Sequence, residues 1–254
     1  CLDWSENPIE STEEMSLFTR ALSQSDTVEQ LIFAGNGNEN AQALLLGVDF
    51  STYKVLNLRG NNLQTNGRTD IPDLIAANTS LRWLYLHSNK MNDDDAVLIA
   101  QSLGGNTHLT NLEVEDNDIQ ERGMRALYEA VNDTSTLNAL SDSNHSCFPA
   151  GLSDNFDLRA INLQDGPNGL HTNRMCKIRK LIAERYRTGG GNVPHLNTEM
   201  RDEGAVLLAP FVMESVVRRH DAFRKSYDES SACSLGLLYE LVRDWKMAEL
   251  FSFR

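Results

Sequence analysis

One eleven-residue pattern returns through the first half of the chain and restricts its fold more than any other feature. The pattern is L-x-x-L-x-L-x-x-N-x-L, with other apolar residues in place of some leucines, and its clearest copies are Tyr53–Leu63, Leu81–Met91 and Leu109–Ile119. The second leucine falls at residues 56, 84 and 112, so the period is 28 residues twice over. A repeat of this length predicts a solenoid of stacked units, each too small to bury its own apolar face.

The intervals between these copies have helical spacing. Apolar residues recur at i, i+3, i+4 and i+7 within 96–103 and again within 124–131, and a shorter version lies at 71–75. Each such interval predicts a helix with one apolar face. The sequence therefore predicts an α/β solenoid with a curved parallel sheet on the concave side and helices on the convex side.

Weaker copies extend the array in both directions. Residues 28–38 and 2–9 place apolar residues and asparagine in matching slots, and a shorter interval around residues 41–46 explains the 25-residue step from Leu31 to Leu56. At the other end Leu137 and Leu140 keep the step, but the strand pattern then fails and the asparagine is displaced to residue 144. We expect an array of about five to six repeats over residues 1–148. The recurrent asparagine is expected to satisfy backbone groups at the turn after each strand.

The repeat resembles the ribonuclease-inhibitor class of leucine-rich repeats, over residues 1–148. Segment 136–147 and the tail 237–251 also resemble the end-of-array motif and closing helix of uncharacterised leucine-rich-repeat proteins from diatoms. Repeats of this class occur in inhibitors, in activators of the Ran GTPase and in immune receptors. Protein recognition is what these proteins share, so the resemblance implies a protein partner without naming it.

Residues 149–254 lose the repeat and are interpreted as a C-terminal helical capping region, because the terminal unit of a solenoid needs a cover for its apolar flank. Helices are expected at 173–186, 202–219 and 234–251, with a glycine turn at 189–191. The basic side of the first of these helices can hold an anionic partner, neutralise the acidic repeats or simply face solvent.

The formal net charge is −13, which disfavours nucleic acid and anionic membrane surfaces as partners. A basic protein partner is compatible with this charge, although an acidic surface can equally serve solubility alone. Four dispersed cysteines, without metal or redox spacing, predict reduced thiols and, with them, a cytoplasmic location. Because Cys1 falls inside what looks like a repeat, we expect the chain to be an N-terminally truncated fragment. No stretch is apolar enough to insert directly into a membrane.

No motif of a hydrolase, nucleotide-binding protein or metalloenzyme is visible, so we predict neither an enzyme nor a cofactor. Two acidic clusters, 93–95 and 116–118, lack the remainder of a calcium loop and are interpreted as helix caps or loops. Three N-x-S/T sequons begin at Asn78, Asn132 and Asn144 and are interpreted as turn chemistry, with glycosylation the lesser alternative.

The best candidates for function are residues that alternate with the framework leucines, since they point away from the core. Aromatic side chains give rigid area for a partner, and opposite charges on neighbouring strands orient it. The partner-binding set is Arg59, Trp83, Tyr85, His87, Glu113 and Glu115.

The first hypothesis for function is a non-enzymatic scaffold or sensor that binds a protein on the concave face. The alternative is a structural subunit of a larger assembly, held through the C-terminal cap or the flanks. A third hypothesis, regulation of a small GTPase, follows from the family resemblance alone.

Overall fold

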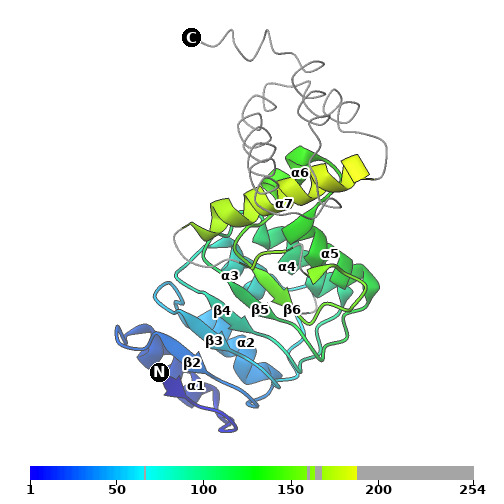
Figure 1. Cartoon of the computed structure of the whole chain (residues 1–254). Coiled ribbons are helices and arrows are strands. Elements are labelled where there is room, and N and C mark those ends of the chain that lie inside the picture. The colour runs from blue at the N-terminus through cyan, green and yellow to red at the C-terminus, as the bar shows by residue number, and fades with distance from the viewer. Residues whose placement is uncertain (66, 159–160, 164–167, 188–254) are drawn as a thin grey trace. The chain divides into compact units, whose positions relative to one another are not determined.

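The computed structural model describes residues 1–65, 67–158, 161–163 and 168–187. Within these residues six short parallel strands form one sheet in the order β1-β2-β3-β4-β5-β6, which Figure 1 shows side by side. The strands are β1 (Leu2–Asp3), β2 (Gln30–Ile32), β3 (Val55–Asn57), β4 (Trp83–Tyr85), β5 (Asn111–Glu113) and β6 (Phe148–Ala150). The helices are α1 (Thr12–Ser23), α2 (Asn38–Gly47), α3 (Asp70–Ala76), α4 (Asp93–Leu103), α5 (Glu121–Asn132), α6 (Leu137–Asp142) and α7 (Gly169–Arg187).

The chain forms two compact units. The first comprises Cys1–Asn132 with Asn144–Leu170, and the second comprises Asp133–Ser143 with His171–Arg254. The first unit holds the whole sheet and helices α1 to α5.

The strand register confirms the predicted period. Leu56 of β3 lies opposite Leu84 of β4, and Leu84 lies opposite Leu112 of β5. The weaker copies follow the same register, with Leu2 opposite Leu31. These leucines are buried or half-buried in a core that they share with the apolar faces of the helices, so stacking supplies the burial that a single repeat lacks.

The recurrent asparagines form the predicted ladder of hydrogen bonds. Oδ1 of Asn61 accepts from the backbone N–H of Asn36 at 2.7 Å, and Oδ1 of Asn89 accepts from that of Asn61 at 3.0 Å. Nδ2 of Asn89 donates to the carbonyls of Leu58 and Leu86 in two successive repeats. The residue before each ladder asparagine has a left-handed φ, and these residues are Glu6, Gly35, Gly60, Ser88 and Asp116. The turns after β1, β2, β3, β4 and β5 therefore share a left-handed residue at the same position.

The acidic cluster at 93–95 caps helices, whereas the cluster at 116–118 lies in the loop before α5; these are the two alternatives that we predicted. Asn92 and Asp95 form a capping box at the start of α4, in which Asn92 N–H donates to Asp95 Oδ2 at 2.9 Å. Asp93 Oδ1 accepts from the N–H groups of Gln120 and Gly123 in the next repeat. Both carboxylates satisfy backbone donors that a helix start leaves unpaired.

The predicted turn chemistry is observed at two of the three sequons, Asn78 and Asn144. Asn144 is 2% exposed, and its side-chain amide donates to the carbonyls of Leu103 and Asn106. Asn78 has a φ of 48° and accepts from Thr107 N–H at 2.9 Å. Asn132 donates to the hydroxyl of Tyr128. These amide groups serve the fold.

The sheet continues past the array end that we predicted at residue 148. Strand β6 pairs with β5 and places Pro149 opposite Leu112, whereas the leucines at 137 and 140 belong to helix α6. Beyond β6, Leu152 and Ile161 enter the core and the Phe156 ring lies 4.9 Å from that of Tyr128. Apolar residues that follow β6 thus extend the core of the first unit.

In the second unit the predicted helix at 173–186 is part of α7, where Arg174 Nε donates to Ser141 Oγ of α6 at 2.9 Å. Lys177 and Arg185 are buried, so these two basic residues are not a surface for an anionic partner. The expected glycine turn at 189–191 and the expected helices at 202–219 and 234–251 lie outside the described residues.

Candidate functional site

The open face of the sheet is the face opposite the buried leucines, and its central part is made by β3, β4 and β5. Asn57, Tyr85 and Glu113 lie in one cross-strand row on this face. Trp83 lies one row before them and is 46% exposed, an unusual degree for the largest apolar side chain. Neighbouring strands lie about 4.8 Å apart, so side chains in one row are within contact distance.

Three rings line the open face along β4 and the turn that follows it. The ring centroids of Trp83 and Tyr85 are 6.3 Å apart, and those of Tyr85 and His87 are 6.2 Å apart. The planes are inclined by 59° and 78°, which are tilted and edge-to-face arrangements that aromatic pairs prefer. The rings of Trp83, Tyr85 and His87 are called the aromatic ridge below.

The carboxylate of Glu113 lies beside the end of the aromatic ridge. Its Oε2 is 3.3 Å from Nδ1 of His87, and the two side chains are 31% and 21% exposed. This contact between His87 and Glu113 is not a hydrogen bond: within the described part of the chain, Nδ1 of His87 has no hydrogen-bond partner. Burial raises the pKa of Tyr85, and the charge of Glu113 raises it further. The Tyr85 hydroxyl therefore stays protonated at neutral pH, and the charge of Glu113 contributes to its raised pKa.

Arg59 has a different electrostatic neighbour. Hydrogen bonds from Ser5 lower the pKa of Asp3, and the charge of Arg59 lowers it further. Arg59 N–H donates to Asn57 Oδ1 at 3.0 Å, which fixes the turn from which its side chain extends. The sheet register places Asp3 in the same row as Asn57, through Ile32. Sequence reasoning missed Asp3, although its slot in the first repeat signals this position.

Glu115 is exposed two residues after the end of β5, beside Gly151 in the loop that follows β6. Its carbonyl accepts from Ser88 N–H at 2.9 Å, which ties it to the turn after β4. The structure thus gathers Trp83, Tyr85, His87 and Glu113. Glu115 follows Glu113 by two residues, and the charge of Arg59 acts on Asp3 of β1.

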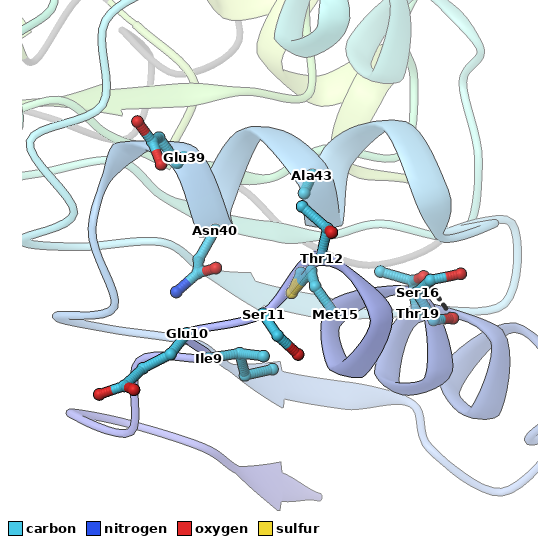
Figure 2. A pocket seen from close by; sticks show the side chains of 10 residues that line it. All are labelled: Ile9, Glu10, Ser11, Thr12, Met15, Ser16, Thr19, Glu39, Asn40 and Ala43. Carbon is cyan, nitrogen blue, oxygen red and sulfur yellow. Dashed lines mark hydrogen bonds between the residues drawn. The ribbon is translucent and has the colours of Figure 1, made fainter.

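A separate pocket of about 300 Å³ lies between α1 and α2, and Figure 2 shows its lining. Ile9, Met15 and Ala43 form its apolar part, and Glu10, Glu39 and Asn40 its polar rim. Thr19 Oγ1 inside it donates to Ser16 carbonyl at 3.2 Å, so this hydroxyl is used within α1. The side chains that line this pocket do not bring together a nucleophile, an acid and a base.

In the described part of the chain, no group of three or more His, Cys, Asp or Glu side chains is placed to hold a metal ion. None of the described helices is both long enough and apolar enough to span a bilayer.

The class of protein follows from the sheet and from a sequence match together. Six parallel strands alternating with helices make an α/β leucine-rich-repeat fold. Residues 105–127, which contain β5 and the start of α5, match the family described as Leucine Rich repeat. Leucine-rich repeats generally mediate protein–protein interaction, and no catalytic family is indicated.

Particular relatives are more distant. Over 100 residues the chain is 33% identical to leucine-rich repeat-containing protein 45 of Gallus gallus, a match that covers 38% of this chain and 15% of that protein. The chain is also similar to the solved structure of Leiomodin-1 Actin-Binding Site 2 (ABS2), with 14% identity, a TM-score of 0.42 and coverage of 71% of this chain and 95% of that one. The ribonuclease-inhibitor-like and diatom resemblances stay predictions.

Proposed function

We propose that the open face of β3, β4 and β5 binds a protein partner and that the chain acts as a non-enzymatic scaffold or sensor. One observation carries the proposal: Trp83 is 46% exposed at one end of the aromatic ridge. Leaving this much aromatic surface in water is unfavourable by roughly 25 cal/mol per Å², and a partner removes that penalty. Rigid aromatic side chains beside charged groups are typical of binding hot spots.

The chain offers matched apolar residues elsewhere for a control. Leu17 on α1 is 54% exposed and Leu46 on α2 is 69% exposed, and both lie away from the open face. If partner binding were only non-specific adsorption to exposed apolar side chains, it would depend on these leucines as much as on the aromatic ridge.

The test is affinity capture from a native lysate with three forms of the full chain: wild type, Trp83→Ala/Tyr85→Ala and Leu17→Ala/Leu46→Ala. We expect a partner that wild type and the leucine variant retain and that the aromatic variant binds at least about 30-fold more weakly, since a hot-spot residue contributes about 2 kcal/mol or more. Circular dichroism of each form checks that the fold is intact. A partner retained equally by all three forms would remove the open face as the working surface and favour the assembly-subunit hypothesis.

A further inference from the structure

The chemistry of the partner follows from the charges around the aromatic ridge, and this inference rests on the proposed function of the open face. The Glu113 carboxylate accepts no hydrogen bond from the described residues; its near neighbour is Nδ1 of His87 at 3.3 Å, without hydrogen-bond geometry. The side chain is 31% exposed, so water reaches it only in part. A half-buried carboxylate without donors gains more from a charged donor than one that is fully hydrated.

The aromatic ridge favours the same kind of donor. A cation is attracted to the face of an aromatic ring, more strongly to Trp and Tyr than to Phe, and Arg does this more often than Lys. Tyr85 lies directly opposite Glu113 in the sheet register, and Trp83 lies 6.3 Å from Tyr85 between ring centroids. A cation beside Glu113 can therefore contact a ring and a carboxylate at once.

The wider charge distribution points the same way. Glu115, whose backbone lies about 7 Å further along at about 3.3 Å per residue, adds a second acidic residue that is exposed. The charge of Arg59 acts on Asp3, at the other end of the row that runs from β1 to β5. The side of the ridge formed by β5 thus repels an acidic segment and attracts a basic one.

We infer that the corner formed by Tyr85, Glu113 and Glu115 binds an arginine side chain of the protein partner, with its guanidinium on the ring of Tyr85 and its N–H groups donated to the carboxylate of Glu113. A planar guanidinium suits this corner better than a lysine ammonium, because it can stack on a ring and donate two parallel hydrogen bonds to one carboxylate. An acidic or purely apolar segment offers no charged hydrogen-bond donor to the Glu113 carboxylate.

The net charge of −13 makes long-range attraction of any basic peptide a competing explanation, so the test needs a charge-matched control. Glu13 of α1 and Glu129 of α5 are exposed on helices and lie outside the strands of the open face. The variants Glu113→Gln/Glu115→Gln and Glu13→Gln/Glu129→Gln remove the same charge with isosteric side chains.

The probe is a randomised 12-residue peptide display library, selected separately on wild type, on both glutamine variants and on Trp83→Ala/Tyr85→Ala. We expect arginine to be enriched several-fold in peptides selected on wild type and on the helix-face variant, and to return to its input frequency on Glu113→Gln/Glu115→Gln. One selected peptide is then resynthesised with citrulline or lysine in place of its key arginine. Citrulline keeps the shape and removes the charge, so we expect about a tenfold or greater loss of affinity for wild type and a loss of less than about twofold for Glu113→Gln/Glu115→Gln.

The outcomes separate the two proposals. Peptides that require Trp83 and Tyr85 but carry no arginine, or that bind equally well with citrulline, would overturn the arginine inference and leave the open face as the binding surface. Arginine enrichment that both glutamine variants reduce equally would assign the effect to general acidity and also overturn it. Peptides that bind all forms alike would count against the open face itself.

Discussion

Gly151 lies so close to Glu115 that a Cβ atom built on the glycine would come within 2.8 Å of the Glu115 backbone nitrogen. Gly151 also has a φ of 90°, a conformation that L-residues with side chains rarely adopt. The close approach holds the turn after β6 against the segment that follows β5, where the Glu115 side chain also lies beside Gly151. This contact therefore restrains the backbone that carries Glu115, one of the two acidic residues of the proposed site.

Replacement of Gly151 by alanine is expected to destabilise the first unit by about 2–4 kcal/mol, because the strained φ and the collision with backbone atoms add. Urea unfolding followed by circular dichroism measures the change. Gly105→Ala is the matched control, since a Cβ at Gly105 meets nothing within 4 Å and should alter stability by less than about 1 kcal/mol. Equal stability of the two variants would contradict the proposed close contact.

The asparagine ladder predicts a difference between two residues in the same slot. Asn89 is buried and accepts from the N–H groups of Asn61 and Leu63. Half-buried Asn117 accepts, among the described residues, from the N–H of Met91 only. Each buried N–H left without a partner costs about 1–3 kcal/mol. Asn89→Ala should therefore lose about 3–5 kcal/mol of unfolding free energy, and Asn117→Ala about 1–2 kcal/mol. A ranking in the opposite order in urea unfolding would show that the ladder bonds do not set the stability.

The framework of the fold was predictable because every repeat places the same residue type in the same surroundings. Leu56, Leu84 and Leu112 share a period and a register, so sequence spacing sufficed to predict β3, β4 and β5. Strand β6 lacks this leucine, because Pro149 lies opposite Leu112. Proline has no backbone N–H to donate and in sheets is found mainly in edge strands, so its presence did not predict a strand. Its pairing with β5 depends on contacts between residues far apart in the chain.

The sequence predicted which residues lie on the open face. It did not predict which of their side chains contact one another. Alternation along the strands placed Tyr85 and Glu113 on the open face correctly. The approach of His87 to Glu113 and the influence of Arg59 on Asp3 depend on side-chain directions at the turns after the strands. Spacing along the sequence carries no information about those directions.

The capping box of α4 predicts a pH effect on stability. Asp95 is 2% exposed, and burial raises the pKa of its carboxyl, while hydrogen bonds from the backbone of Asn92 and Thr65 oppose that rise and Asp94 adds to it. A carboxyl with a raised pKa in the folded state binds its proton more tightly there than in the unfolded state. Its contribution to stability is therefore full below the unfolded value of 3.8 and is lost as the pH rises through the folded value.

Asp95→Asn removes this buried charge and keeps an oxygen that can accept from Asn92 N–H. We expect its unfolding free energy at pH 7 to equal or exceed that of wild type, and its dependence on pH above 3.8 to be flatter. Asp95→Ala is the contrasting variant, because it loses the cap and should be less stable by about 1–2 kcal/mol at pH 7. Urea unfolding between pH 4 and pH 7 measures both; a steeper pH dependence for Asp95→Asn would refute the assignment.

The electrostatic coupling across the open face can be read at Tyr85. Because burial is the larger cause of the raised pKa of Tyr85 and the Glu113 charge the smaller, Glu113→Gln should lower that pKa without returning it to 10.0. NMR titration of ring-labelled tyrosine, with the Tyr85 signal assigned through Tyr85→Phe, measures the change. Glu115→Gln is the control and should leave the Tyr85 signal nearly unshifted, since Glu115 is not among the causes of the raised pKa.

The interaction between Glu113 and Tyr85 also predicts how the free energy of unfolding changes at high pH. A tyrosine whose folded pKa exceeds its unfolded value of about 10 favours the folded state below that pH and loses this contribution as the pH rises through the folded value. Glu113→Gln should therefore weaken the fall in stability above pH 10. If Glu115→Gln shifted the Tyr85 titration as much as Glu113→Gln, the effect would belong to general acidity. A selective response to Glu113 would place its charge at the ring, where the proposed arginine has to bind.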